Sequence, residues 1–259
     1  MKKIIIVLYL TLILSASLSM NGCSGIFSGD NSGTPAPDLL AVYNSAITDA
    51  MTAETNEIYT GLTLINDTNS ALIRKNDRIA VTTFMKPTYI NSYKNARDTG
   101  DSLEIKFDCW VSAEPELKNF IKNTGLKDTD SVRLRAEQLL GLPPDNSYTY
   151  IVSFWVKPDD LKRPGFNDDI TKQINELTMP ANLNSTYKNW FYQNFYNSYM
   201  APSKFPWTRL GYTYDWGSGA RPHVGLTEFI IKNKYNSDAN TNATVYVQGV
   251  YTISEYFGF

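Results

Sequence analysis

The most constraining feature of this sequence is a series of short segments in which apolar and polar residues alternate. Alternation with a period of two places successive side chains on opposite faces of a β-strand. We expect strands over residues 57–65, 71–75, 78–85, 103–111, 148–156, 208–216, 226–232 and 244–253. Brief turns such as Asn76-Asp77 separate the first four segments, which predicts that these four form an antiparallel meander.

Four other segments have apolar residues at the spacing of an amphipathic helix. The expected helices cover residues 39–53, 114–122, 130–140 and 186–200. Asp38 stands where the first helix needs an N-cap. Gly141, followed by Pro143-Pro144, predicts that the third helix ends at residue 140.

Residues 38–259 show no internal repeat and no change of composition. Hydrophobic residues make up 42% of the chain, which is enough for a core without cross-links. We therefore predict one α+β domain over residues 38–259, with a mostly antiparallel sheet and about four helices. A division into two domains near Pro143-Pro144 is the alternative.

The N-terminal residues have the pattern of a secretory signal. Lys2 and Lys3 precede a fifteen-residue apolar run, Ile4 to Leu18, and small and polar residues follow it. The run is shorter than the roughly 20 residues that a membrane-spanning helix needs. We predict that residues 1–22 form a signal peptide; an uncleaved N-terminal anchor is the alternative.

Met20-Asn21-Gly22-Cys23 resembles the lipobox of bacterial lipoproteins. In that family the cysteine thiol receives a diacylglycerol, the leader is cut before it, and the new amine takes a fatty acid such as palmitate. The resemblance implies lipidation at Cys23, although Met20 and Asn21 depart from the usual residues. Ser24 implies export to the outer membrane, facing the periplasm or the surface. A secreted protein with an unmodified Cys23 is the alternative.

Residues 24–37 are rich in Gly, Ser, Pro and Asn and offer almost nothing to bury. Such a composition is typical of a flexible tether. Residues 23–37 are therefore predicted to link the lipid to the domain.

Two blocks of the body, Leu134–Pro164 and Pro206–Gly217, resemble an uncharacterised family of bacterial proteins that are often predicted to be exported. The resemblance extends over roughly residues 57–256. It implies a single domain, and it implies no activity and no residue role.

The charge balance limits the partners to be expected. The chain carries 24 basic and 26 acidic residues, a formal net charge of −2. Such a balance argues against a surface that follows nucleic-acid phosphates. One histidine and two cysteines argue against a zinc site, and the sequence has no nucleotide-binding motif. We expect no metal or cofactor, and a membrane contact through the lipid.

Catalytic patterns are incomplete. His223, the only histidine, lies in a Gly/Pro-rich loop and could act as a general base with Cys109 or a serine, which makes an envelope hydrolase the alternative function. In strand alternation Cys109 shares a face with Ile105 and Phe107, which favours a buried thiol. No catalytic residue is assigned.

Ser185-Thr186-Tyr187-Lys188 matches the SxxK pattern of penicillin-recognising enzymes. The companion motifs of those enzymes are missing. An ordinary N-cap role for Ser185 is therefore the preferred interpretation.

Pro206 to His223 is the densest polar and aromatic stretch, and tyrosine and tryptophan are abundant throughout, as in many glycan-binding proteins. In strand alternation Arg209 and Asp215 share a face, where they could pair or grip a polar ligand. The candidate ligand-binding residues are Arg163, Trp207, Arg209, Asp215, Trp216 and His223. Burial of the rings in the core is the alternative.

These patterns predict a lipid-anchored protein of the bacterial cell envelope that acts as a binding or structural module. A glycan or an envelope protein is the candidate partner. The oligomeric state and the choice between inner and outer membrane stay open.

Overall fold

The computed structural model describes residues 38–237 and 239–259. The predicted signal peptide, Cys23 and the tether lie outside these residues. Within them, no helix combines the length and the apolar character needed to cross a bilayer.

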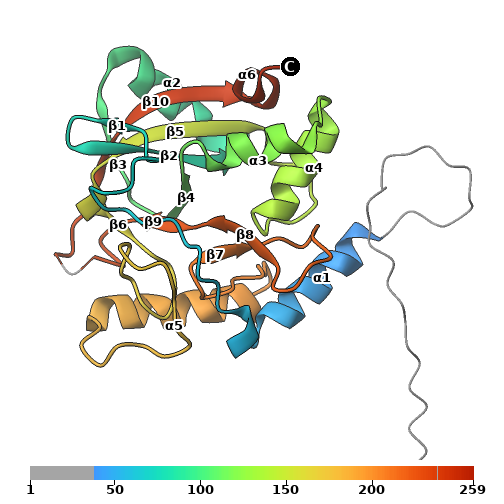
Figure 1. Ribbon diagram of the computed structural model, residues 1–259. Helices are drawn as coiled ribbons and strands as arrows, with labels where there is room; N and C mark the ends of the chain where they lie inside the picture. The colour runs from blue at the N-terminus through green and yellow to red at the C-terminus, as the bar shows by residue number, and fades with distance from the viewer. Residues whose placement is uncertain (1–37, 238) are drawn as a thin grey trace, which may run out of the picture. The chain divides into compact units, whose positions relative to one another are not determined.

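An eight-stranded sheet forms the centre of the fold, and every strand pairing is antiparallel (Figure 1). Its order is β3 (Ser102–Glu104), β10 (Thr244–Thr252), β5 (Tyr150–Val156), β2 (Arg78–Met85), β4 (Cys109–Ala113), β9 (Phe229–Ile231) and β6 (Leu161–Lys162), with β1 (Arg74–Lys75) paired to β2. A second pair joins β7 (Tyr212–Tyr214) and β8 (Val224–Thr227).

The described residues form six α-helices: α1 (Leu39–Ala50), α2 (Ile90–Thr99), α3 (Glu116–Thr124), α4 (Thr129–Leu139), α5 (Ser185–Tyr199) and α6 (Ile253–Phe257). Short 3₁₀ turns cover Thr55–Glu57, Pro87–Tyr89 and Pro158–Asp160. The four expected helices, α1, α3, α4 and α5, are confirmed, and α2 and α6 are additions. The α+β class is also confirmed.

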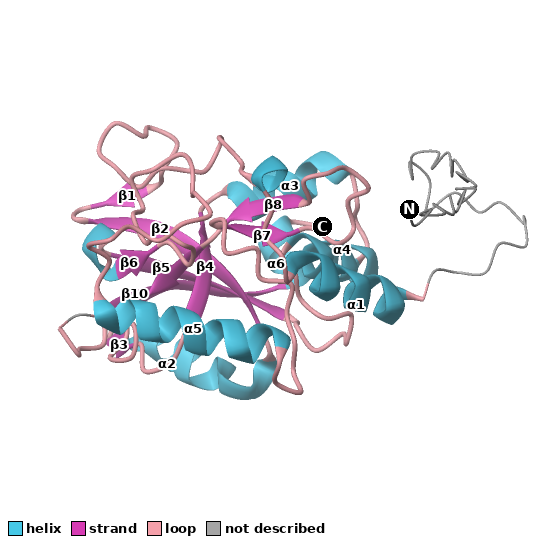
Figure 2. Ribbon diagram, turned by 90° about the horizontal axis from the view of Figure 1, so that it is seen from below, coloured by secondary structure: helices cyan, strands magenta, loops and turns pink. Residues whose placement is uncertain are grey.

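Three larger apolar clusters of the described residues hold the layers together, and a smaller fourth one joins Leu62, Leu210 and Tyr212. One lies between the sheet and α2, around Val81, Phe154 and Phe229. A second packs α3, α4 and α6 against the other face, around Leu117 and Ile151. The third is largely aromatic and joins α1 and α5, which lie on the same side of the molecule in Figures 1 and 2, to β7 and β9.

The predicted meander is confirmed only in part, because β1 pairs with β2 and β2 pairs with β4, but residues 57–65 join no ladder. β2 lies between β5 and β4, and β3 lies at the far edge beside β10. The expected strand 103–111 is divided, because residues 105–108 leave the ladder between β3 and β4. Ile105 and Cys109 are buried as expected, whereas Phe107 is 50% exposed.

The expected strand 57–65 is wrong. Its backbone forms single hydrogen bonds to a loop, from Leu62 N to Gln173 O and from Ile65 N to Ile170 O, and no ladder. The expected strand 208–216 shrinks to Tyr212–Tyr214, because Arg209 (φ 61°) and Gly211 (φ 82°) take left-handed conformations that interrupt an extended chain.

The alternative of two domains near Pro143-Pro144 is excluded by the sheet order. β5 follows these prolines in sequence, yet it pairs with β2, which precedes them, and with β10. The two halves of the chain therefore build one sheet and one domain.

Candidate functional site

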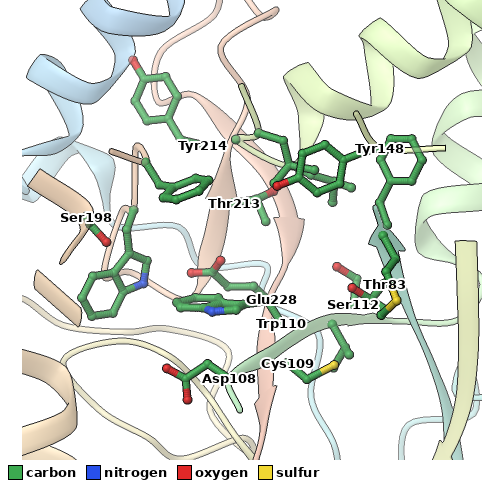
Figure 3. A pocket seen from close by; sticks show the side chains of 18 of the residues that line it. Thr83, Asp108, Cys109, Trp110, Ser112, Tyr148, Ser198, Thr213, Tyr214 and Glu228 are labelled. Carbon is green, nitrogen blue, oxygen red and sulfur yellow. The ribbon is translucent and has the colours of Figure 1, made fainter. Parts of the chain in front are cut away.

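A cavity of about 470 Å³ lies between the end of β2, the strand β4, the helix α5 and the loop 203–207 (Figure 3). Its volume falls in the range of pockets that hold small organic ligands, about 300–1,000 Å³. Residues from several distant segments line it, so the cavity exists only in the complete fold.

Aromatic rings form much of the cavity wall. The rings of the interior come from Phe84, Trp110, Tyr148, Trp207 and Tyr214. The indoles of Trp110 and Trp207 meet edge to face, with centroids 6.0 Å apart. Phe107 and Phe205 stand at the mouth, 50% and 36% exposed. These flat apolar surfaces favour the body of an organic ligand.

A row of polar side chains crosses the sheet toward the cavity. Thr82 pairs with Ser153 on one side and with Ser112 on the other. Val111 pairs with Phe229, so the preceding residue, Glu228, continues the row beyond Ser112. Thr82, Ser112 and Glu228 all line the cavity.

At the end of this row away from the cavity, beyond Ser153, the polar groups have hydrogen-bond partners within the protein. Ser153 Oγ donates to Glu114 Oε1 at 2.7 Å, and the Tyr256 hydroxyl donates to Glu114 Oε2 at 2.8 Å. Both oxygens of the Glu114 carboxylate therefore have partners, in contrast to the cavity end.

Glu228 is the most unusual residue of the site. It lies between β8 and β9, is 5% exposed, and its Oε1 has no hydrogen-bond partner among the described residues. Burial raises the pKa of Glu228 to about 8, while Arg163 and the Trp207 indole act in the opposite direction. Near neutral pH its carboxyl group can therefore hold or release a proton.

A second polar group of the cavity also lacks a partner. Asn194 on α5 lines the cavity, and its Nδ2 is buried without a hydrogen bond to the described residues. Buried polar groups normally have partners, so two unpaired groups around one cavity indicate a place for a bound molecule.

Asp108 is fixed at the cavity by neighbouring donors. Its Oδ2 accepts from Trp190 Nε1 at 2.9 Å, and its Oδ1 accepts from Asn233 Nδ2 at 2.8 Å. These contacts hold its carboxylate in one orientation without neutralising its charge.

Of the six predicted ligand-binding residues, only Trp207 lines the cavity. Its indole N–H donates to Pro164 O at 3.2 Å. Trp216 is buried outside the cavity lining, where its indole N–H donates to Leu142 O at 2.9 Å and its ring contacts the Tyr43 ring edge to face. The four charged or titratable candidates do not converge in the cavity.

The two arginines instead bind backbone carbonyls. Arg163 Nη2 donates to Thr63 O, Ile170 O and Lys172 O at 2.9–3.2 Å. Arg209 donates to Ala50 O at 2.8 Å and to Met51 O at 3.1 Å, where α1 ends.

The expected face shared by Arg209 and Asp215 is not formed, because the strand is interrupted. Asp215 makes a two-point ion pair with Arg135 of α4, at 2.9 and 2.6 Å. His223 Nδ1 lies 3.0 Å from Ser218 O, and its ring stacks on Tyr214 at 4.7 Å.

The geometry does not favour the catalytic alternatives. Cys109 borders the cavity, but burial raises the pKa of its thiol to about 12, which keeps it protonated. His223 is not among the residues that line the cavity.

The SxxK residues lie at the start of α5. Asn184, and not Ser185, caps the helix, with its Oδ1 accepting from Thr186 N at 2.7 Å. Lys188 Nζ approaches Ala181 O at 3.5 Å. The N-cap is thus one residue earlier than expected.

No group of three or more His, Cys, Asp or Glu side chains in residues 38–237 and 239–259 is arranged to hold a metal ion. No family model, no curated protein and no solved structure matches this chain. The lipobox and the exported-family resemblance therefore stay predictions.

Three residues of the cavity, Trp110, Asn194 and Glu228, were not predicted from the sequence patterns. The available signal was weak: Glu228 is a single acid in the apolar run Leu226–Ile231, and Ser112 interrupts a buried strand in the same way. A polar residue at a position expected to be buried was the only indication of a site.

Proposed function

We propose that this protein is a lipid-anchored module of the bacterial cell envelope that binds a small organic ligand in the cavity of Figure 3. The observation that carries this proposal is the aromatic cavity of about 470 Å³ with two buried, unpaired polar groups, Glu228 Oε1 and Asn194 Nδ2. Pockets of this kind bury most of a ligand and orient it with a few polar contacts.

The envelope location is supported by the N-terminal sequence. The basic residues, the apolar run and Gly22-Cys23 follow the order of a lipoprotein signal. Two or three acyl chains would hold the protein stably, because each buried CH₂ contributes about 0.8 kcal/mol. We place the domain at the outer membrane, facing the periplasm or the surface.

Ligand binding is tested with the purified full chain by ligand-observed NMR against a library of small organic fragments. Asn197 is an exposed cavity residue on α5, and Asn197→Trp should block the mouth. Asn189→Trp, at an exposed position of the same helix outside the cavity, is the matched control.

We expect fragments that bind the wild type and the control, with at least fivefold weaker binding to Asn197→Trp. Either a complete lack of fragment binding or binding that Asn197→Trp does not change would overturn the binding proposal.

The anchor is tested by mass spectrometry of the N-terminal peptide from protein produced in a bacterial host. The expected peptide starts at Cys23 and carries the mass of a diacylglycerol and an amide-linked acyl chain. Cys23→Ser should leave the leader uncut. An intact leader or an unmodified thiol in the wild type contradicts the proposal.

A further inference from the structure

We propose that the cavity selects an organic cation, an ammonium group carried on an apolar body, over neutral and anionic ligands. This inference rests on the proposed binding function and names the chemical class of its ligand. It follows from the charge of the lining, from the aromatic rings and from the unpaired carboxyl oxygen of Glu228.

The charged residues of the lining are all acidic. Asp108 and Glu228 are the charged residues of the lining, which contains no lysine, arginine or histidine. Glu228 is buried, whereas Asp108 is exposed and its carboxylate accepts from Trp190 and Asn233. An anionic ligand would meet two carboxyl groups and no compensating base. At the buried carboxyl group of Glu228, a cation would find an opposite charge in a setting of reduced dielectric once that group is ionised, and the attraction there is stronger than in water.

The rings supply the second half of a cation site. An ammonium group is attracted to the face of an aromatic ring, most strongly to tryptophan. Trp110 projects from β4 into the cavity, next to Glu228 in Figure 3, and Trp207 meets it edge to face. Two indoles and a carboxylate around one space form a common recognition site for alkylammonium ions.

Arg163 is the basic group whose charge interacts with Glu228. It lies outside the cavity lining, with its guanidinium over the Phe229 ring. Glu116 and Asp169 act on the same guanidinium. Three acids therefore act on one base, and once Glu116 and Glu228 are ionised, toward and above pH 8, their combined charge exceeds that of Arg163.

A neutral ligand could instead accept a hydrogen bond from protonated Glu228, and the two cases differ in pH dependence. Burial raises the pKa of Glu228 to about 8. A cation needs the ionised carboxylate and should bind more tightly as pH rises through 8. A hydrogen-bond acceptor needs the protonated group and should bind less tightly.

The other groups around Glu228 limit what else can titrate. Tyr187 and Tyr199 of α5 and Tyr212 of β7 interact with it, and burial raises the pKa of each well above neutrality. Glu116, acting through Arg163, has a pKa raised to about 7 by burial. Among these groups, Glu228 is therefore the one whose raised pKa, about 8, lies between pH 7.5 and 8.5.

The test compares choline, which keeps its charge at every pH, with its uncharged isostere 3,3-dimethylbutan-1-ol. Binding to the full chain is followed by tryptophan fluorescence and ligand-observed NMR at pH 6.5 and 8.5. We expect choline to bind at least tenfold more tightly than the alcohol at pH 8.5. Its affinity should rise at least threefold from pH 6.5 to 8.5.

Two variants assign the effect to Glu228. At pH 8.5, Glu228→Gln should weaken choline binding at least tenfold and leave alcohol binding within twofold. It should also remove the pH dependence of choline binding. Glu137→Gln is the matched control, because Glu137 is a fully buried glutamate with unpaired oxygens that lies outside the cavity lining. Glu137→Gln should leave the affinity for both probes unchanged.

His223 stacks on the cavity residue Tyr214, so the pH series is repeated in His223→Gln, where the rise should persist. If Glu228→Gln fails to fold, the pH dependence of the wild type decides. Equal binding of the two probes, tighter binding of the alcohol, or choline affinity that falls with pH overturns the inference. A lack of choline binding also overturns the inference. If fragments still bind in that case and Asn197→Trp blocks their binding, the proposed function stands.

Discussion

Two buried glutamates link protonation to the stability of this protein. Glu137 on α4 is fully buried, with both carboxyl oxygens unpaired among the described residues, and burial raises its pKa to about 7. Burial raises the pKa of Glu228 to about 8. In the unfolded chain both pKa values return to about 4.3. The folded state therefore binds these protons more tightly, and stability falls as pH rises from about 4.5 toward 8.

Replacing Glu137 by Gln should remove its share of this pH dependence. We expect the unfolding free energy of Glu137→Gln, relative to the wild type, to increase by about 2 kcal/mol or more from pH 5 to pH 8, since one pKa unit corresponds to about 1.4 kcal/mol. Urea denaturation at both pH values measures it. The exposed Glu176→Gln is the control and should show no change. A constant difference for Glu137→Gln would contradict the argument.

Arg209 has a structural explanation that can be separated from a binding role. Its guanidinium is buried and donates to Ala50 O and Met51 O at the end of α1. Arg209→Met should lower the unfolding free energy by about 3 kcal/mol, because hydrogen bonds from charged groups contribute about 1.5–3 kcal/mol each. Arg221→Met, which removes an exposed partner of Asp49, should cost less than about 1 kcal/mol.

Chemical denaturation and fragment binding, measured together on Arg209→Met, separate the two roles. Unchanged stability with lost ligand affinity would show that Arg209 belongs to the binding site after all.

At the scale of elements, the start of α5 offers a matched pair of neighbours. Asn184 Oδ1 accepts from Thr186 N, whereas Ser185 is the exposed first residue of the helix. Asn184→Ala should lower the unfolding free energy by about 1 kcal/mol, the usual contribution of an N-cap. Ser185→Ala should change it by less than about 0.3 kcal/mol. Urea denaturation decides, and the reverse order would restore Ser185 as the cap.

The elements that sequence patterns predicted well have strong local signals. Asp38 does cap α1, through Leu40 N and Ala41 N, and Gly141 does take a left-handed conformation after α4. β2 has the predicted bounds, because alternating β-branched residues and a turn at Asn76 define it locally. α2 was missed because its mean character is polar and its buried residues, Ile90, Tyr93 and Ala96, form only a narrow stripe.

The elements that were predicted wrongly depend on distant partners. Residues 57–65 alternate as a strand should, but the chain places a loop beside them, so no ladder forms. The left-handed Arg209 is unusual for a residue with a side chain, and nothing in the local sequence announces it. The cavity was missed for the same reason, since Trp110, Asn194 and Glu228 meet only through the tertiary fold.

At the scale of the whole molecule, strands from the two halves of the sequence are interleaved in one sheet. β10, near the C-terminus, separates β3 from β5, and β5 lies between β10 and β2. Neither half of the sequence contains all the strands with which its own strands pair. The cavity has the same property, because Thr82 and Ser112 come from the first half and Thr213 and Glu228 from the second.

This interleaving predicts one cooperative unfolding transition for the full chain. Midpoints measured by tryptophan fluorescence, which reports on the aromatic cluster, and by far-UV circular dichroism, which reports on the sheet, should coincide. Fragments covering residues 38–142 and 144–259 should each lack a folded spectrum, since each exposes strand edges that the other covers. Two separated transitions, or one fragment that folds alone, would contradict the single-domain organisation. Ligand that binds the intact cavity should raise the common midpoint of both signals, because it stabilises only the state in which the two halves are joined.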